Sequence, residues 1–379
     1  MISAILPALV TSCSRGHDTA QDQLQPTDSA TSAAEPADPG CAQLSALSAR
    51  DTLAQLLMVG VRDAADARAV VTDHHVGGIF IGSWTELSML TDGSLAEITR
   101  NQGGPLPLAV SVDEEGGRVS RLSSLIGTSP SAKELASAST PAQVRELAAE
   151  RGHKMADLGI TVDFAPVVDV VDADTDDDSV IGDRSFGSDP AKVTEYAGAY
   201  AQGLRDAGVL PVLKHFPGHG HGSGDSHTAG AVVTPPLAQL QDNDLVPYRT
   251  LVTQAPVAVM MGHLEVPGLT DDPASLSPAA VNLLRTGTDY HAPAFDGPVF
   301  SDDLSSMAAI TEHYGVPEAV LRSLNAGVDI ALWVTTDEVP AVLDRLEQAL
   351  GSGELKREAV DASLARVAAV KKPGTVCHR

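Results

Sequence analysis

The sequence predicts an α/β protein whose folded part is a single (β/α)8 barrel of the TIM type. Eight short apolar runs alternate with longer amphipathic stretches from Ser45 onward, and no long linker separates them. The runs are apolar throughout, as in parallel strands that are covered on both faces. Eight such repeats in about 300 residues favour a closed barrel, and a doubly wound open sheet is the alternative.

Each element can be placed in order along the chain. Three of the amphipathic stretches are long enough to be assigned as helices, at 141–158, 189–207 and 338–350. The apolar runs that we predict as strands are 56–61, 78–81, 106–112, 160–168, 209–213, 257–261, 298–300 and 328–334. The barrel domain is expected to span 45–379, with no second domain after it.

Composition limits the function. Apolar residues make up 43% of the 379 residues, and the net charge is −25, so the chain is a globule that would be repelled by nucleic acid and by anionic bilayers. Aromatic residues make up only 3%, too few for a long polysaccharide-binding surface. We therefore expect a small-molecule substrate and no nucleic-acid partner.

The chain begins with an apolar segment, 1–12, followed by Cys13. Residues 10–13, Val-Thr-Ser-Cys, resemble the lipobox of bacterial lipoproteins, which predicts lipid attachment at Cys13 and export to the cell envelope. The segment is short and lacks basic residues, so it is either a truncated signal or a stretch without a role. The polar composition of 13–44 predicts a disordered linker, which leaves the lipid as the only expected membrane contact.

Two further cysteines, Cys41 and Cys377, lie near the two ends of the predicted barrel domain. In an oxidising compartment they could form a disulfide, and the alternative is two free thiols, because cysteine counting does not give connectivity. The sequence has no Cys-x-x-Cys motif, so a thiolate metal site is not expected.

Polar side chains follow five of the predicted strands. In a barrel of this kind the reactive groups lie on the loops at the carboxyl ends of the strands. Any single one of these residues could instead cap the following helix, but five sets together indicate a site. The sets are 113–115, Asp169, 214–215, 263–265 and 302–303.

The loop from Lys214 to His227 contains four histidines among several glycines. Three interpretations compete: a zinc site, a surface loop without a role, and a mobile catalytic loop in which Asp225 orients His227. The loop has no helix to present histidines at i and i+4, and long glycine-rich loops in compact domains are usually functional. An imidazole can exchange protons near neutral pH, which favours the catalytic interpretation.

Three motifs together resemble glycoside hydrolase family 3. They are Lys-His-Phe-Pro-Gly-His-Gly with Asp-Ser-His at 214–227, Ser-Asp-Asp-Leu at 301–304, and Asp-Glu-Glu-Gly-Gly-Arg at 113–118. The subgroup that the chain resembles is the bacterial β-N-acetylglucosaminidases, and the similarity extends from about Gln55 to Val334. The resemblance implies the catalytic roles below.

The covalent nucleophile implied by the resemblance is Asp302. A carboxylate can attack the anomeric carbon and form a glycosyl-enzyme that water later opens, with retention of configuration. Asp303 is the rival, but neighbouring side chains on a strand point to opposite faces. The implied acid/base is His227, with Asp225 as its partner. Glu114 and Glu115 look structural.

The resemblance also suggests residues that bind the sugar. Carboxylates accept hydrogen bonds from hydroxyl groups, and Arg, Lys and His side chains donate to hydroxyl oxygens. The suggested residues are Asp113, Arg121, Arg184, Lys214, His215 and His263. A core position is the alternative for His263, and an ion-pair role is the alternative for the arginines.

The expected activity is that of a retaining exo-β-N-acetylglucosaminidase, acting as a monomer on cell-wall muropeptide fragments without a metal or organic cofactor. A β-glucosidase or an N-acetylglucosaminide phosphorylase on the same scaffold is one alternative. A noncatalytic sugar-binding lipoprotein is an alternative of another class.

Overall fold

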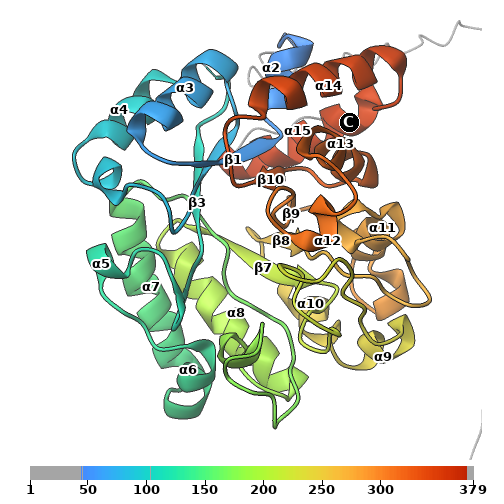
Figure 1. Ribbon diagram of the computed structural model, residues 1–379. Helices are drawn as coiled ribbons and strands as arrows, with labels where there is room; N and C mark the ends of the chain where they lie inside the picture. Colours follow the sequence, from blue (N-terminus) through green and yellow to red (C-terminus); the bar gives the residue numbers. More distant parts are fainter. Residues whose placement is uncertain (1–43, 45, 103, 374–379) are drawn as a thin grey trace, which may run out of the picture. The chain divides into compact units, whose positions relative to one another are not determined.

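The computed structural model describes Leu44, residues 46–102 and residues 104–373. Within this part, eight strands form one sheet in the order β10-β1-β2-β3-β6-β7-β8-β9 (Figure 1). The strands of the sheet are β1 (Leu57–Val61), β2 (Gly78–Ile81), β3 (Ala109–Val112), β6 (Val162–Asp163), β7 (Leu210–Phe216), β8 (Ala258–Met261), β9 (Val299–Ser301) and β10 (Ala331–Trp333). A separate antiparallel hairpin consists of β4 (Glu114–Gly116) and β5 (Val119–Ser120).

The sheet closes between its last two strands. The N–H of Ser301 donates to the carbonyl of Ile330 at 3.0 Å, and the N–H of Ile330 donates to the carbonyl of Val299 at 3.0 Å. Neighbouring strands of this sheet follow one another in the sequence, so the strand order nowhere reverses as it does in a doubly wound sheet. The predicted parallel barrel is confirmed, and the open-sheet alternative is wrong.

Helices surround the strands on the outside of the barrel (Figure 1). The α-helices are α2 (Ala49–Ala54), α3 (Ala64–His74), α4 (Ser94–Asn101), α5 (Ser123–Ile126), α6 (Ala132–Ala138), α7 (Pro141–Asp157), α8 (Pro190–Asp206), α9 (Leu237–Asp242), α10 (Val246–Leu251), α11 (Pro278–Thr286), α12 (Ala308–Thr311), α13 (Val316–Ala326), α14 (Val339–Ser352) and α15 (Arg357–Lys371). Short 3-10 helices lie at Leu87–Leu90, Gly182–Arg184, Ala274–Leu276 and Thr288–Tyr290.

The three predicted helices correspond to α7, α8 and α14, each to within two residues at either end. Their starts follow from capping chemistry. Thr140 and Gln143 form a reciprocal capping box before α7, and the Asp189 side chain accepts from the N–H of Ala191 before α8. Both helices have proline in the first turn, where its missing N–H costs no helical hydrogen bond.

Several predicted strands are shorter than their apolar runs, and the difference is largest at 160–168. Only Val162–Asp163 of the run 160–168 forms the strand β6. Pro166 has no N–H to donate to a ladder, and pairing resumes beyond it as a single parallel bridge between Val167 and Lys214. Apolar composition alone therefore overestimates the strand.

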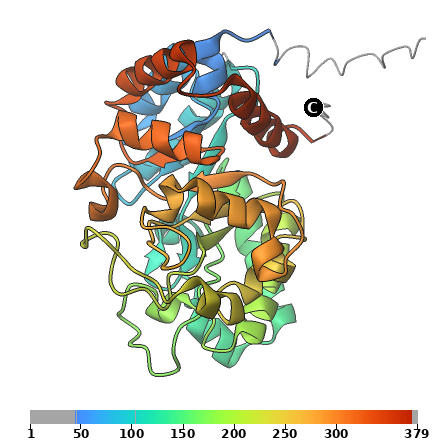
Figure 2. The same ribbon diagram turned by 90° about the vertical axis from the view of Figure 1, so that its right-hand side faces the viewer.

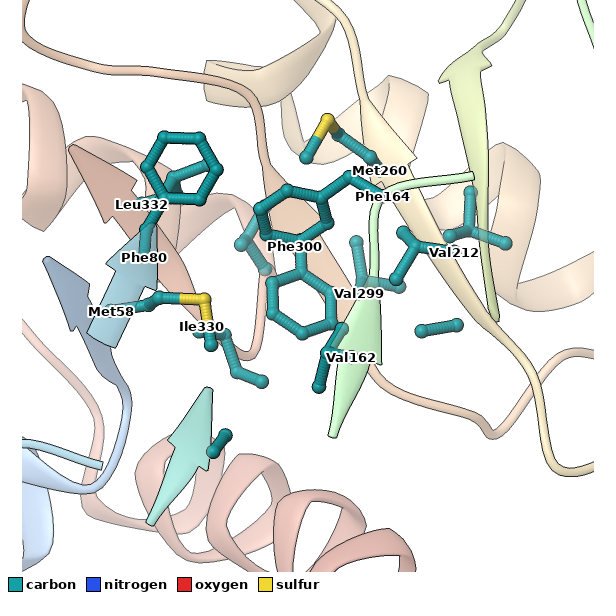
Figure 3. Close-up of a cluster of buried hydrophobic side chains, with 14 of the residues drawn as sticks. Met58, Phe80, Val162, Phe164, Val212, Met260, Val299, Phe300, Ile330 and Leu332 are labelled. Carbon is teal, nitrogen blue, oxygen red and sulfur yellow. The ribbon is translucent and has the colours of Figure 1, made fainter. Parts of the chain in front are cut away.

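The barrel interior is filled by side chains, as Figure 3 shows for a cluster that includes Phe80, Phe164 and Phe300. The rings of Phe164 and Phe300 meet edge to face, with centroids 5.4 Å apart, and Phe80 lies 5.7 Å from Phe164. The barrel is a packed core rather than a pore, so its two ends are separate.

The first and last helices of the described chain lie side by side. Figure 2 shows α14 and α15 next to the first folded residues, and Arg50 of α2 donates to Asp344 of α14 at 2.9 Å. Leu44, which the sequence placed at the end of a linker, is buried. No helix in the described residues has both the length and the apolar content that crossing a bilayer requires.

Several predicted features lie outside the described residues. They are the signal segment 1–12, the linker as far as residue 43, the lipid attachment at Cys13 and the pairing of Cys41 with Cys377. They stay predictions.

Candidate active site

A cavity of about 310 Å³ opens at the carboxyl ends of the strands. Apolar side chains from inside the barrel, among them Phe80, Phe164, Met260 and Leu332 of Figure 3, form part of its wall. The cavity is lined by seven of the nine predicted catalytic and binding residues: Asp113, Arg121, Arg184, Lys214, His215, His227 and Asp302. As expected for residues that follow the strands of a barrel, side chains as far as 189 positions apart in the sequence meet in one cavity.

The two adjacent aspartates after β9 have different environments. Both carboxylate oxygens of Asp303 are occupied, because Oδ1 accepts from the N–H and hydroxyl of Ser305 and Oδ2 accepts from those of Ser306. The Asp302 carboxylate accepts one hydrogen bond, from the N–H of Asp303 at 2.9 Å. Asp303 thus holds the turn in place, while Asp302 keeps acceptor capacity toward the cavity.

The Asp302 carboxyl is ionised although it is buried. Burial alone would raise the pKa of this carboxyl, but the nearby imidazoles of His263 and His215 and the N–H of Asp303 lower the pKa below its ordinary value. An ionised carboxylate next to a small cavity is a competent nucleophile.

His227 reaches the same cavity from the long loop after β7. Its Nδ1 lies 2.6 Å from Oδ1 of Asp225, and its backbone N–H donates to the same oxygen at 3.0 Å. Because Nδ1–H donates to the Asp225 carboxylate, Nε2 remains available for proton exchange. Asp225 does not line the cavity, and its carboxylate faces the His227 imidazole.

The loop that carries His227 is held by one contact within the loop and one attachment to the barrel rim. The buried Ser226 hydroxyl lies 3.3 Å from Nε2 of His219, and the N–H groups of Ala308 and Ala309 donate to the carbonyls of His227 and Ser226. The attachment to the rim is at the start of α12, which follows Asp302 closely in the chain. The histidine and the aspartate are therefore held by the same part of the barrel rim.

A buried network of opposite charges lines another side of the cavity. Lys214 Nζ lies 2.6 Å from both Asp113 Oδ1 and Glu115 Oε1, and Arg184 forms a two-pronged pair with Glu115 at 2.8 and 2.9 Å. Burial alone would raise the pKa of Glu115, but the two cations hold it far below its usual range. Glu115 thus fixes Lys214 and Arg184 while leaving each of them spare donors.

His215 is oriented from behind by a buried carboxylate. Its Nδ1 lies 2.7 Å from Asp169 Oδ2, and Asp169 Oδ1 accepts from the N–H of His219 at 2.8 Å. Burial would raise the pKa of Asp169, but the two histidines lower it. His215 Nε2 is left for a ligand in the cavity, and Asp169 is a positioning residue that the sequence analysis placed only among the strand-end sets.

His263 does not line the cavity. It is buried behind the wall, where Nδ1 meets Ser275 Oγ at 2.6 Å and Nε2 meets the Asp303 carbonyl at 2.7 Å. Burial lowers the pKa of this imidazole. Its Nε2–H donates to the Asp303 carbonyl, because a carbonyl oxygen can only accept. Both ring nitrogens are engaged by the protein, which matches the core alternative and not a direct sugar contact.

Trp84 is a site residue that sequence reasoning missed. Its side chain lies at the cavity rim with 44% of its surface exposed, and its ring meets Phe80 edge to face at 5.9 Å. The ring packs directly over Gly82, where an added Cβ would lie 2.4 Å from it. The Thr85 hydroxyl donates to the Val61 carbonyl at 2.6 Å and fixes the same turn. A fixed, exposed aromatic ring can accept the apolar face of a sugar.

A metal centre would require side chains that are grouped as metal ligands. In the part of the chain that the structure describes, no three His, Cys, Asp or Glu side chains are grouped to hold an ion. Three histidines of the long loop instead bond to carboxylates: His215 to Asp169, His221 to Asp244 and His227 to Asp225. The ring of His219 meets the Ser226 hydroxyl.

A sequence profile described as the glycosyl hydrolase family 3 N-terminal domain matches residues 48–370. The chain belongs to glycosyl hydrolase family 3. The match covers the whole barrel, from before β1 to within α15.

Relatives of known name agree with the family. Beta-hexosaminidase LpqI of Mycobacterium tuberculosis is 68% identical, over all of this chain and 98% of the relative. A solved structure of M. tuberculosis LpqI has 72% identity and a TM-score of 0.86, over 89% of this chain and 98% of that one. A family 3 β-N-acetylglucosaminidase from Paenibacillus sp. has 33% identity and a TM-score of 0.79, over 86% and 62%. This family 3 chain is therefore a glycoside hydrolase, and the alternative of a noncatalytic sugar-binding lipoprotein is wrong.

Proposed function

We propose that this family 3 enzyme is a retaining exo-β-N-acetylglucosaminidase, with Asp302 as nucleophile and His227 as general acid/base. The observation that carries the proposal is that Asp302 and His227, 75 positions apart, line one cavity and that Asp225 orients the histidine. The names of the hexosaminidase relatives support the sugar assigned.

The first chemical step forms a bond between Asp302 and the sugar. The carboxylate oxygen attacks the anomeric carbon from the face opposite the leaving group, and the glycosidic C–O bond breaks. The leaving oxygen takes the proton from Nε2 of His227, which is protonated at this stage. Asp225 stabilises that imidazolium through Nδ1–H, at 2.6 Å.

The second step restores the enzyme. Water attacks the anomeric carbon, its proton passes to Nε2 of His227, and the bond to Asp302 breaks with the electron pair returning to the carboxylate. Two inversions give net retention. Since the imidazole is neutral between the steps, it does not repel an incoming nucleophile.

The sugar-binding part of the proposal rests on unused donors and acceptors. Lys214 and Arg184 have donors beyond those given to Glu115 and Asp113, and His215 keeps Nε2. Arg121 has no hydrogen-bond partner among the described residues, and it lines the cavity. Asp113 completes this set as an acceptor for adjacent hydroxyls.

We assign Trp84 to the leaving-group side of the cavity. The ring is at the rim, whereas the charged network lies on the wall, so a terminal sugar held by the charges would leave its neighbour close to the indole. A small cavity with one such platform fits removal of single terminal residues rather than binding along a polysaccharide.

The biological setting proposed is the cell envelope, with the enzyme monomeric and anchored by a lipid on Cys13, and with muropeptide fragments as substrates. Metabolic labelling with an alkynyl fatty acid tests the anchor: wild-type protein should be labelled and Cys13→Ser should not. Labelling of both, or of neither, would contradict the anchor and leave the enzymatic assignment to its own test.

The enzymatic assignment is tested with a panel of aryl β-glycosides, with and without added phosphate. We expect turnover of the N-acetylglucosaminide, a β-configured product, no turnover of the glucoside and no sugar phosphate. Preference for the glucoside, or formation of a sugar 1-phosphate, would replace the proposed activity by the corresponding alternative.

A further inference from the structure

A second cavity, of about 400 Å³, lies at the opposite end of the barrel from the candidate active site. Its wall includes the first residues of three strands, Ala109 of β3, Val162 of β6 and Leu210 of β7. The end of α15 forms another side, with Val367 and Lys371. The interior cluster of Figure 3, which includes Phe164 and Phe300, stands between the two cavities.

Lys371 brings a cation to this cavity without a matching anion. Its Nζ donates to the carbonyl of Gly77 at 2.5 Å, and among the described residues it forms no salt bridge with a carboxylate. Burial lowers the pKa of Lys371 to about 7. An ammonium group in such surroundings is stabilised strongly by a bound anion.

Arg205, at the end of α8, brings a second cation to the same cavity. Its Nη2 donates to Gln202 at 2.9 Å and to Gln254 at 3.3 Å, but its buried Nη1 has no hydrogen-bond partner among the described residues. The neighbouring Asp206 is bound to Arg145 at 2.7 Å. Two cationic groups therefore line a mainly apolar cavity whose described lining residues include no carboxylate to pair with them.

We propose that this cavity binds a small amphiphilic carboxylate, with its head group between Lys371 and Arg205 and its apolar chain against Leu108, Val162 and Val367. The volume lies in the range typical of small-molecule sites, and the combination of unpaired cations with apolar walls selects an anion that carries a hydrocarbon chain. The inference goes beyond the proposed glycosidase activity and uses none of its residues.

Isothermal titration of the full chain with sodium decanoate tests the proposal. Decanoate should bind at one site, and acetate and decan-1-ol should each bind at least about tenfold more weakly, because one lacks the chain and the other the charge. Lys371→Met and Arg205→Gln should each weaken decanoate binding by about tenfold. Circular dichroism spectra of the same samples report that the variants are folded.

The matched control is Lys372→Met, which removes an exposed lysine next to Lys371 and should leave decanoate affinity unchanged. Absence of decanoate binding to the wild-type chain would overturn the proposal, as would equal binding by Lys371→Met. An equal loss in Lys372→Met would show that net charge rather than the cavity attracts the anion, which also overturns it. The titration contains no glycoside, so its result is independent of the proposed catalytic function.

Discussion

The imidazole Nδ1 of His227 lies 2.6 Å from Oδ1 of Asp225, and this carboxylate oxygen also accepts from the histidine's own backbone N–H. The pair is compact because the two residues are only two positions apart on one turn of the loop. Burial would raise the pKa of Asp225, but the two N–H groups lower it, so the carboxylate is charged at neutral pH. The orientation of His227, the proposed acid, is thus set by contacts within residues 225–227.

The His227→Ala variant should depend strongly on the leaving group. Loss of the general acid should reduce kcat/KM by about 10²–10⁴-fold for alkyl or sugar leaving groups, which need protonation. For a 2,4-dinitrophenyl glycoside, whose leaving group departs as an anion, the reduction should be much smaller. An equal loss on both substrates would contradict the role of His227 as the proton donor.

The acid side of the pH profile should report Asp302. Its pKa lies below the ordinary carboxyl value, so the nucleophile stays ionised as the pH falls and is protonated only below the pH range in which carboxyl groups ordinarily titrate. Activity is therefore retained above that range and lost beneath it, provided that the protein stays folded. A kcat/KM profile with intrinsic fluorescence recorded alongside checks this, and an acid limb near neutral pH in folded protein would contradict it.

A buried ion pair outside the cavity should control stability rather than catalysis. Arg151 Nη2 lies 2.5 Å from Oε1 of Glu114, and both side chains are almost fully buried. Arg151→Met leaves the carboxylate without its cation and should lower the free energy of unfolding by about 3–5 kcal/mol. Guanidinium denaturation measures this loss.

The control for that variant is Arg145→Met, which removes an exposed pair with Asp206. Exposed pairs contribute about 0–1 kcal/mol, so its unfolding free energy should be nearly that of the wild type. Similar losses in the two arginine variants would show that the burial of the Glu114 pair has no energetic consequence.

Replacing Trp84 should separate binding of the leaving group from catalysis. Contact over about 50 Å² of apolar ring at about 25 cal/mol per Å² contributes roughly 1.3 kcal/mol, so Trp84→Ala should raise KM for a disaccharide by about tenfold. KM for an N-acetylglucosaminyl fluoride, which has no second sugar, should change little. Leu125→Ala, another exposed apolar residue, is the control and should change neither. Equal changes for both substrates would contradict the assignment.

Much of the fold was predictable because its signals are local or additive. Eight apolar runs and three long amphipathic stretches locate the repeating units. The rule that reactive groups follow the strands of a barrel then gathers Asp113, Lys214 and Asp302 at one rim. The predicted strand length at 160–168 was wrong, because Pro166 interrupts the backbone pairing and hydropathy alone carries no information about that interruption.

The missing parts of the site depend on tertiary packing. Nothing in the local sequence of His263 distinguishes a cavity wall from the core, because its partners Ser275 and the Asp303 carbonyl come from other loops. Trp84 gave one usable signal, a large aromatic residue two positions after a glycine at a strand end, but its exposure depends on packing against Phe80. The second cavity forms only because α15 packs over the amino ends of the strands, and no sequence motif predicts that packing.

The central claim is that Asp302 becomes bonded to the sugar, and a covalent adduct measures it most directly. A 5-fluoro-N-acetylglucosaminyl fluoride should slow both steps and accumulate the intermediate, which mass spectrometry of peptic fragments can locate. We predict one added sugar on the fragment that contains Asp302, and none in Asp302→Asn. An adduct on another residue, or turnover of this reagent by Asp302→Asn at the wild-type rate, would contradict the account.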